Sequence, residues 1–282
     1  KRIIGVSRFS QAANKDYLES LGIETIAGDL VSQDFIKSLP DVDNVIYLAG
    51  TKFGTQGNEP YTWIMNSFIP GLVVEQYKTS RIVALSTGCV YPLVDVNSGG
   101  SLESDQALPV GEYAQSCLGR ERLFQYGSME NKTPISLIRL NYAVEMRYGV
   151  LVDIALKVKN NKPVDVTMGY ANVIWQGDAN AFILRSLLMC ESPAKILNIT
   201  GLETISVKDV AIEFGQLMGK EVVVTGEEDD VALLSNSSLI TKEMGSPEVS
   251  TDEVIKWTAD WVKAGKSVHG KPTHFEVKDG KY

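Results

Sequence analysis

A hydroxyl pair and a tyrosine carry the chemistry that this sequence suggests. Ser86 and Thr87 close an apolar run, and Tyr113 follows about 26 residues later at the start of a helical pattern. A phenol can move a proton to or from a substrate oxygen, and a nearby hydroxyl can hold that oxygen in place. Cys117 stands four residues after Tyr113, where a proton-transferring tyrosine would benefit from a cation. The sequence thus raises the question of what activates this tyrosine.

Short apolar runs alternate with helical patterns around these residues. Runs rich in Val, Ile and Leu predict strands at Arg2–Ser7, Glu24–Ala27, Asn44–Leu48, Arg81–Ser86 and Ser136–Leu140. Helical spacing lies between them at Lys15–Leu21, Phe35–Leu39, Tyr61–Tyr77 and Tyr113–Tyr126. Because parallel strands need crossover connections and bury both faces, this alternation predicts a doubly wound parallel α/β sheet. Ligands of such sheets bind beyond the carboxyl ends of the strands, where Thr87 and Tyr113 can meet.

The second half of the chain predicts a smaller α/β lobe. We expect strands at Ile196–Ile199 and Glu221–Thr225, and helices at Val207–Met218, ended by Gly219, and at Thr251–Ala264. The last helix opens on a capping-box-like Ser250 and Thr251. The tail that follows carries His269 and His274, and we expect it to lie on the surface, because no cluster of Cys or carboxylate residues accompanies the histidines.

Composition narrows the classes of partner. The net charge of −8 is spread over interspersed acids and bases, which leaves no basic stripe for nucleic acid or an anionic membrane. The three cysteines, Cys89, Cys117 and Cys190, are too few and too scattered for a disulfide framework or a zinc site. No apolar run approaches the roughly 20 residues that span a bilayer. We therefore expect a cytoplasmic protein with a small-molecule substrate, without a metal, nucleic-acid or membrane partner.

Several motifs in a fixed order resemble one family. They are Gly28-Asp29-Leu30, Leu48-Ala49-Gly50, Asn66, Ser86-Thr87-Gly88-Cys89-Val90-Tyr91, Tyr113, Arg139-Leu140-Asn141 and Val173–Asp178. In this order and spacing the chain resembles the extended short-chain dehydrogenase/reductases, in particular the NAD-dependent epimerase/dehydratase group that acts on nucleotide sugars. The resemblance covers nearly the whole chain. It implies a Rossmann-like dinucleotide-binding part over residues 1–141 and a mainly substrate-binding lobe over residues 142–282, with residues 173–200 returning to the sheet.

The resemblance also implies roles for individual residues. The catalytic set is Thr87, Tyr113, Asn66 and, at the position of the family's YxxxK lysine, Cys117. The cofactor NAD or NADP would be bound by Arg8, Asp29, Leu30, Leu48, Ala49, Gly50 and Ser86, and the substrate by Asn141 and Arg147. Arg8 favours NADP slightly, because it can meet a 2′-phosphate at the end of the second family strand. A homodimer through the two long helices is implied as well.

Two departures from the family pattern concern the cofactor and the tyrosine. The glycine-rich turn that holds the pyrophosphate is absent, and Arg2–Ser7 corresponds to the family's second strand. We therefore expect that about 30 residues, the size of one strand and crossover unit, are missing ahead of Lys1, and their absence would leave unpaired edges in the sheet. The family's lysine hydrogen-bonds the ribose and favours the tyrosinate, and the neutral thiol of Cys117 supplies neither effect. With about 1.4 kcal/mol for each pKa unit, an unshifted tyrosine would cost on the order of 10²-fold in proton transfer.

These departures leave alternatives open. Arg120 and Arg147 are candidate replacement cations, although we expect Arg120 to face solvent and Cys117 to be a small buried filler. Asn66 and Asn141 could instead only tie loops together. Gly88-Cys89 replaces the Asp-Glu pair with which the family's 4,6-dehydratases carry out elimination, so epimerisation or reduction is favoured over dehydration. The rival hypothesis is a non-catalytic nucleotide- or metabolite-binding protein that keeps the fold.

Overall fold

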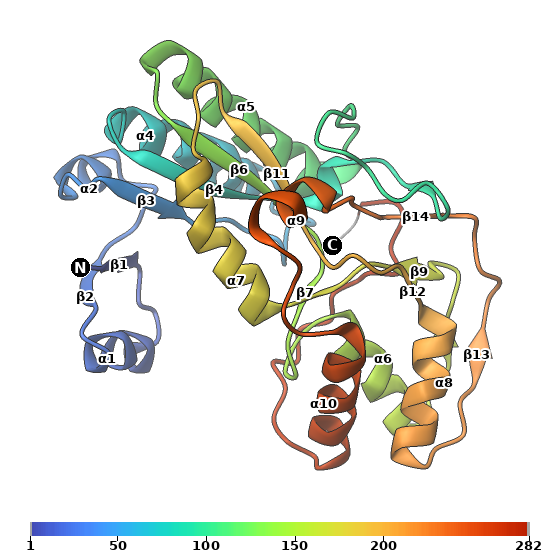
Figure 1. The fold of residues 1–282 in the computed structure, drawn as a ribbon. Coiled ribbons are helices and arrows are strands. Elements are labelled where there is room, and N and C mark those ends of the chain that lie inside the picture. Colours follow the sequence, from blue (N-terminus) through green and yellow to red (C-terminus); the bar gives the residue numbers. More distant parts are fainter. Residues whose placement is uncertain (1, 281–282) are drawn as a thin grey trace.

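Four parallel strands form the central sheet of the protein. A computed structural model describes residues 2–280. The sheet has the order β11 (Lys195–Ile199), β6 (Ile135–Leu140), β4 (Arg81–Thr87) and β3 (Asn44–Tyr47) (Figure 1). The register places Thr87, the last residue of β4, opposite Leu140, the last residue of β6. The carboxyl ends of both strands therefore meet at one rim, and the predicted doubly wound fold is confirmed.

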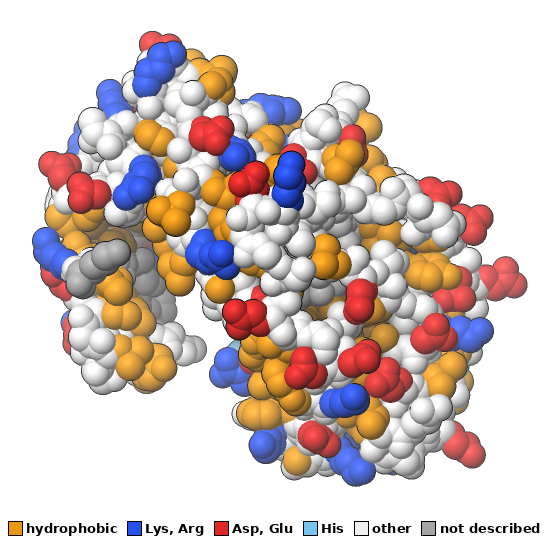
Figure 2. Space-filling view, in the orientation of Figure 1, with side chains coloured by type: hydrophobic (Ala, Val, Ile, Leu, Met, Phe, Trp, Pro, Cys, Tyr) orange, Lys and Arg blue, Asp and Glu red, His pale blue; other side chains and the backbone are white. Residues whose placement is uncertain are grey.

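A second pair of strands lies apart from this sheet. β1 (Ile4–Ser7) and β2 (Glu24–Ala27) pair in parallel with each other and are joined by α1 (Ala12–Ser20). Within residues 2–280, neither strand pairs with β3, whose only strand neighbour is β4. The expected gap in the sheet is therefore present. Figure 2 shows an open notch between the part that carries this pair and the lobe that carries α10 (Thr251–Lys263).

Helices cover the two faces of the sheet, and alternate strand residues point to each face. The helices are α2 (Gln33–Ser38), α4 (Ile69–Gln76) and α5 (Gly111–Asn131) on one face, and α7 (Gln176–Arg185) and α9 (Ser238–Met244) on the other. Ile82 and Ala84 of β4 pack with Phe124 of α5, whereas Val83 packs with Phe182 of α7. Burial of one such aliphatic or aromatic side chain contributes about 1.5–3 kcal/mol. Both faces of β4 are thus packed against helices, and this packing fixes the position of Thr87 at the end of the strand.

The helix expected at Tyr61–Tyr77 is interrupted. The structure has α3 (Glu59–Trp63), a π-helical turn at Ile64–Phe68 and then α4. Pro70 accounts for the break, because its ring would clash with the carbonyl of Asn66 in a continuous α-helix and it has no N–H to donate. A π turn just before a proline relieves that clash. It also places Asn66, which is fully buried, within this turn.

The C-terminal lobe is built on three helices that share one core. They are α6 (Val150–Lys159), α8 (Val207–Met218) and α10, whose buried residues include Leu151, Ile154, Phe214 and Val254. Four two-stranded pairings border it, β7 (Ala143–Val144) with β10 (Ile174–Trp175), β8 (Val164–Asp165) with β13 (Val224–Thr225), β9 (Tyr170–Ala171) with β12 (Ile205–Ser206), and β5 (Val94–Asp95) with β14 (Val231–Ala232). The capping box that opens α10 and the glycine that ends α8 are both present as predicted.

The tail after α10 is not the surface segment that we expected. Thr273 and Phe275 are only 3% and 2% exposed. Asp153 of α6 accepts hydrogen bonds from both the backbone N–H and the hydroxyl of Thr273, at 2.8 and 2.6 Å. Phe275 joins the core of the C-terminal lobe. The expectation failed because it was based only on the two histidines. Thr273 and Phe275, which flank His274, hold the tail on the lobe. Among the described residues, none of the helices is long and apolar enough to cross a bilayer.

Candidate active site

A cavity of about 300 Å³ opens at the carboxyl ends of β3, β4 and β6. Side chains from separate parts of the chain line it, among them Leu48, Thr87, Tyr113, Asn141, Tyr148 and Thr273. It lies where a doubly wound sheet binds its ligands. It therefore brings both halves of the chain to one site.

Thr87 and Tyr113 meet in this cavity. Tyr113 lies in the first turn of α5 and hydrogen-bonds the Thr87 side chain. The Thr87 hydroxyl also accepts a hydrogen bond from the backbone N–H of Cys89 at 3.2 Å. Burial raises the pKa of Tyr113 well above its usual value, whereas Arg120 and the Thr87 hydrogen bond lower it. The tyrosine is thus in place for proton transfer, but its surroundings favour the neutral phenol.

Arg120 is buried beneath the cavity, which corrects our expectation that it faces solvent. Arg120 is only 6% exposed, and it lines the cavity. The guanidinium donates to the carbonyl of Leu85 at 2.7 Å and to Oδ1 and the carbonyl of Asn66 at 2.8 and 3.3 Å. Residues seven apart on an α-helix are two turns apart and share a face, so Arg120 follows Tyr113 inward. The expectation failed because it assigned a charged side chain to solvent, although Arg120 shares a helix face with both Tyr113 and the buried Cys117.

Gly50 makes room for this guanidinium. A Cβ atom at Gly50 would lie 2.4 Å from the Arg120 Nη2 atom, a separation that no real side chain tolerates. The ring of Tyr47, at the end of β3, lies 5.9 Å from the guanidinium carbon. The residues at and just after the end of β3 therefore leave space for the Arg120 guanidinium, which comes from α5.

Cys117 is buried, as predicted for a small filler residue. It is 1% exposed and packs with Val90 and Tyr91. Burial, the largest cause, raises the pKa of its thiol to about 11, although Arg120 opposes the shift. The thiol is therefore protonated near neutral pH and supplies no charge to Tyr113.

Asn66 lies behind the cavity and ties two elements together. Its amide donates to the carbonyl of Thr51 and accepts from the N–H of the same residue, both at 2.8 Å. It also donates to the hydroxyl of Ser116 at 3.0 Å and accepts from Arg120. These contacts fix the loop after β3 against α5. The catalytic role that the resemblance implies for Asn66 stays a prediction.

Ser86 and Asn141 line the cavity, but their side chains bond to protein groups. The hydroxyl of Ser86 donates to Oε1 of Glu121 at 2.5 Å, and the amide of Asn141 donates to Oδ1 of Asn172 at 2.9 Å. Arg147 is exposed, bonds Glu145 at 2.9 Å and does not line the cavity. The ligand contacts predicted for these three residues are untested.

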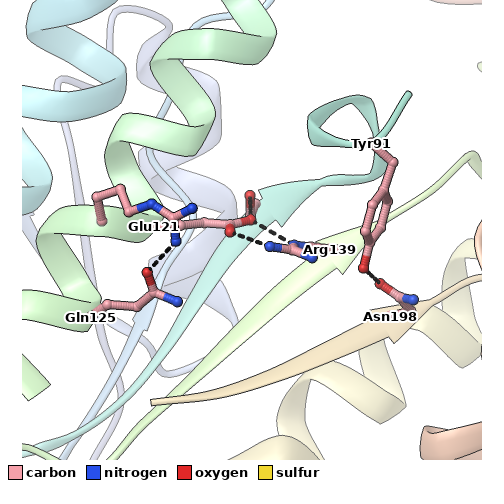
Figure 3. Close-up of polar contacts among 7 residues, drawn as sticks. Tyr91, Glu121, Gln125, Arg139 and Asn198 are labelled. Atoms are coloured by element: carbon pink, nitrogen blue, oxygen red, sulfur yellow. Dashed lines mark hydrogen bonds and ion pairs between the residues drawn. The ribbon is translucent and has the colours of Figure 1, made fainter. Parts of the chain in front are cut away.

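A buried ion pair anchors the helix that carries Tyr113. Arg139 Nη2 lies 2.8 Å from Oε2 of Glu121, and the two side chains are 3% and 0% exposed. The ring of Tyr91 lies 4.6 Å from the guanidinium carbon, and its hydroxyl donates to Oδ1 of Asn198 at 2.8 Å (Figure 3). Because the pair spans α5 and β6, it fixes how deeply the helix sits on the sheet. The hydroxyl of Ser86, on β4, donates a hydrogen bond to the same Glu121 carboxylate.

The residues predicted to bind the cofactor fall into two groups. Leu48 and Gly50 line the cavity, where Leu48 is 64% exposed, and Ala49 packs into the core below. An exposed leucine at a strand end beside a glycine fits a flat ring, as at the nicotinamide end of NAD(P). Ser86 lines the cavity as well, and the remaining three lie at the ends of β1 and β2, where Arg8 and Asp29 are exposed and Leu30 is half-buried. The exposed charges of Arg8 and Asp29 fit the adenosine end of NAD(P). The glycine-rich turn that would hold the pyrophosphate is not among residues 2–280.

Lys52, Tyr148 and Thr273 also line the cavity, and the sequence analysis did not identify them. Lys52 lies two residues after Gly50, so its place just beyond a strand end was a usable signal. Thr273 offered none, because it comes from the tail. In the described part of the chain no three His, Cys, Asp or Glu side chains are grouped to hold a metal ion.

The doubly wound sheet, with a smaller helical lobe over one rim, is the fold of several nucleotide-sugar epimerases and dehydratases of known structure. Solved structures with this fold resemble the chain over most of its length, as the following comparisons show. No protein-family model matches the chain, and no curated protein matches its sequence significantly.

Three solved structures illustrate the likeness. A UDP-glucuronic acid 4-epimerase from Bacillus cereus, in complex with NAD, has a TM-score of 0.76 and 18% identity, covering 93% of this chain and 90% of its own. A dTDP-glucose 4,6-dehydratase from Streptomyces venezuelae, with NAD bound, has a TM-score of 0.77 and 15% identity, covering 93% and 87%. A UDP-glucose 4-epimerase from Thermotoga maritima has a TM-score of 0.73 and 13% identity, covering 94% and 99%. At these identities the likeness establishes the fold.

Proposed function

We propose that the protein is an NAD(P)-dependent epimerase or reductase of a sugar or nucleotide-sugar substrate. The observation that carries the proposal is the hydrogen bond between the side chains of Tyr113 and Thr87 in a cavity that Arg120 also lines. The similar solved structures, which include a UDP-glucuronic acid 4-epimerase in complex with NAD and a UDP-glucose 4-epimerase with UDP-glucose, support the substrate class and the cofactor. Cys89 stands where an eliminating enzyme of this family has an acidic residue, so we propose epimerisation or reduction rather than dehydration.

The residues of this chain would act on one substrate hydroxyl. Bound NAD(P) supplies hydride exchange at the carbon that carries this hydroxyl. Thr87 and Tyr113 hold the substrate oxygen between their hydroxyls, and Tyr113 takes or returns its proton. Arg120 favours the tyrosinate through its charge, since it lowers the pKa of Tyr113. The cation that Cys117 lacks thus comes from farther along the same helix.

One observation favours the rival function. The pKa of Tyr113 is still raised well above its ordinary value, with burial as the largest cause. A tyrosine that stays neutral moves protons slowly, so a non-catalytic nucleotide- or metabolite-binding protein is the second candidate. The two candidates share the fold and differ only in turnover.

Turnover and cofactor binding separate the two functions. The full chain is titrated with NADH and NADPH by fluorescence and then incubated with NAD(P) and a panel of UDP- and dTDP-sugars. We expect conversion that Tyr113→Phe reduces at least about 10²-fold, the usual contribution of a general acid or base, while cofactor affinity is kept. Tyr126→Phe, which removes an exposed hydroxyl from the same helix, is the matched control. Cofactor binding without conversion of any sugar would support the non-catalytic protein and refute the enzyme.

A further inference from the structure

Lys52 brings an ammonium group into the cavity from the loop after β3. It lines the same cavity as Thr87, Cys89 and Tyr113, and it is half-buried. Its Nζ atom donates to the carbonyl of Thr273 at 3.3 Å. A flexible side chain on a surface loop normally keeps its charge in water. The placement of Lys52 inside a concave site therefore needs an explanation.

The surroundings of Lys52 hold it in this place. The preceding residue, Thr51, is clamped through its N–H and its carbonyl by the buried amide of Asn66. Thr273, whose carbonyl accepts the Lys52 hydrogen bond, is itself held by two hydrogen bonds to Asp153. Both the start and the end of this side chain are thus attached to well-anchored groups. Such preorganisation is typical of a functional cation.

Ionisable groups from three elements face the ammonium. They are Cys89, on the short helical turn after β4, Asp153 on α6 and Cys117 on α5; the Asp153 carboxylate favours the charged amine, whereas the Cys117 thiol is neutral near pH 7. Burial is the larger effect and lowers the pKa of Lys52. Cys117 stands at the position of the lysine in the YxxxK pattern and hydrogen-bonds Tyr113. The Lys52 ammonium therefore lies in the neighbourhood that the missing lysine would have occupied.

We propose that Lys52, from the loop after β3, takes over one role of the absent YxxxK lysine and holds a ligand hydroxyl in the cavity. This inference rests on the proposed function. Arg120 cannot hold the ligand in this way, because its guanidinium is fixed against Asn66 and Leu85. The two cations then have different roles. Arg120 supplies a fixed charge below Tyr113, and Lys52 supplies a hydrogen-bond donor within the cavity. No covalent bond to Lys52 forms or breaks, and the proton that moves is the one Tyr113 exchanges with the substrate hydroxyl.

A rescue experiment tests the replacement. Lys52→Met is expected to lower kcat/KM about 10²-fold and to weaken NADH binding several-fold, because the ligand hydroxyl is no longer held in place. Adding Cys117→Lys to Lys52→Met is expected to recover at least about 10-fold of the rate and most of the NADH affinity, because it restores a lysine to the family position. The control is Lys271→Met, which removes an exposed lysine whose Nζ atom lies 6.0 Å from the centroid of the Phe53 ring and which does not line the cavity; it should leave every value unchanged.

The outcomes are distinguishable. A folded double variant, judged by circular dichroism, that recovers neither rate nor NADH affinity overturns the inference, as does Lys52→Met behaving like Lys271→Met. If Lys52→Met does not fold, Lys52→Gln replaces it in both single and double variants. Wild-type protein that binds NADH and converts no sugar would refute the proposed function, and Lys52 is then judged by NADH affinity alone. Loss in the single variant with recovery in the double variant supports the replacement, and loss without recovery refutes it.

Discussion

Replacing Arg120 by Gln should slow the reaction mainly by raising the pKa of Tyr113. Arg120 lowers that pKa, and it lies seven residues after the tyrosine on α5. Two helical turns correspond to about 10 Å along the axis. With an effective dielectric constant of about 20, a unit charge roughly 10 Å away contributes about 1.7 kcal/mol to the stability of the tyrosinate. Because only the tyrosinate accepts a proton, we expect the rate below the Tyr113 pKa to fall about 15-fold.

The assay is the pH dependence of kcat for wild type, Arg120→Gln and Arg120→Lys. The part of the pH profile that reports the tyrosinate should move to higher pH in Arg120→Gln and by less in Arg120→Lys, which keeps the charge. Both variants lose hydrogen bonds to Asn66 and Leu85, at about 1–3 kcal/mol for each buried acceptor left unpaired, so both should unfold at lower urea concentration. A loss of stability alone would therefore not discriminate between a structural and an electrostatic role.

Arg122→Gln is the matched control for this experiment. Arg122 lies two residues farther along α5, is exposed and bonds Gln125 at 2.7 Å. It should change neither the pH profile nor the stability, since surface contacts of this kind contribute little. The electrostatic reasoning is refuted if Arg120→Gln unfolds more easily than Arg122→Gln and yet has the same pH profile of kcat as the wild type.

Further predictions concern stability, cofactor choice and assembly. Glu121→Gln should lower the free energy of unfolding by about 3–5 kcal/mol in urea denaturation, because it leaves a buried arginine without its carboxylate; a loss below about 1 kcal/mol would contradict this. Burial raises the pKa of Asp153 above its unfolded value, so its contribution to stability is present in acid and is lost as the pH rises through the folded pKa. Asp153→Asn, which still offers Thr273 an acceptor, should therefore flatten the fall in stability above about pH 4, and an unchanged slope would count against it. Arg8→Glu should weaken NADPH relative to NADH at least about 10-fold in fluorescence titrations, and an equal loss for both would show that Arg8 does not read the 2′-phosphate. Tyr126, 62% exposed on α5, belongs to one of the two helices through which we expect dimers, so Tyr126→Glu should shift the mass in light scattering toward the monomer, and a monomeric wild type would refute the dimer.

The sheet and its rim could be predicted because they depend on local patterns. The run Arg81–Ser86 differs from β4 by one residue, and Val207–Met218 coincides with α8. Apolar runs of this length have few alternatives to a buried parallel strand. The hydroxyls of Thr87 and Tyr113 follow from those elements, since each lies at the edge of one. The break before α4 was missed because Pro70 acts through the carbonyl four residues earlier, which a count of apolar residues ignores.

The cations of the site could not be predicted in the same way. The burial of Arg120 depends on the space that Gly50 leaves on a different element, and no periodicity within α5 contains that information. The direction of the Lys52 side chain depends on Thr273, more than two hundred residues away in sequence. Contacts of this kind are set by tertiary packing, which overrides local preference. The residues that decide the chemistry are thus the ones least visible in the sequence.

The loss of the motif lysine and the burial of Arg120 are best understood together. A lysine at position 117 would place a second cation next to the Arg120 guanidinium, which already acts on the thiol there, so the Lys52→Met/Cys117→Lys variant should recover only part of the wild-type rate. A small neutral residue at this position avoids the repulsion between two cations and lets the Arg120 guanidinium lie beneath Tyr113. Gly50 is part of the same arrangement, because any side chain there would displace the guanidinium. Cys117 is therefore one member of a coupled set with Gly50 and Arg120, and single replacements within the set should be strongly non-additive.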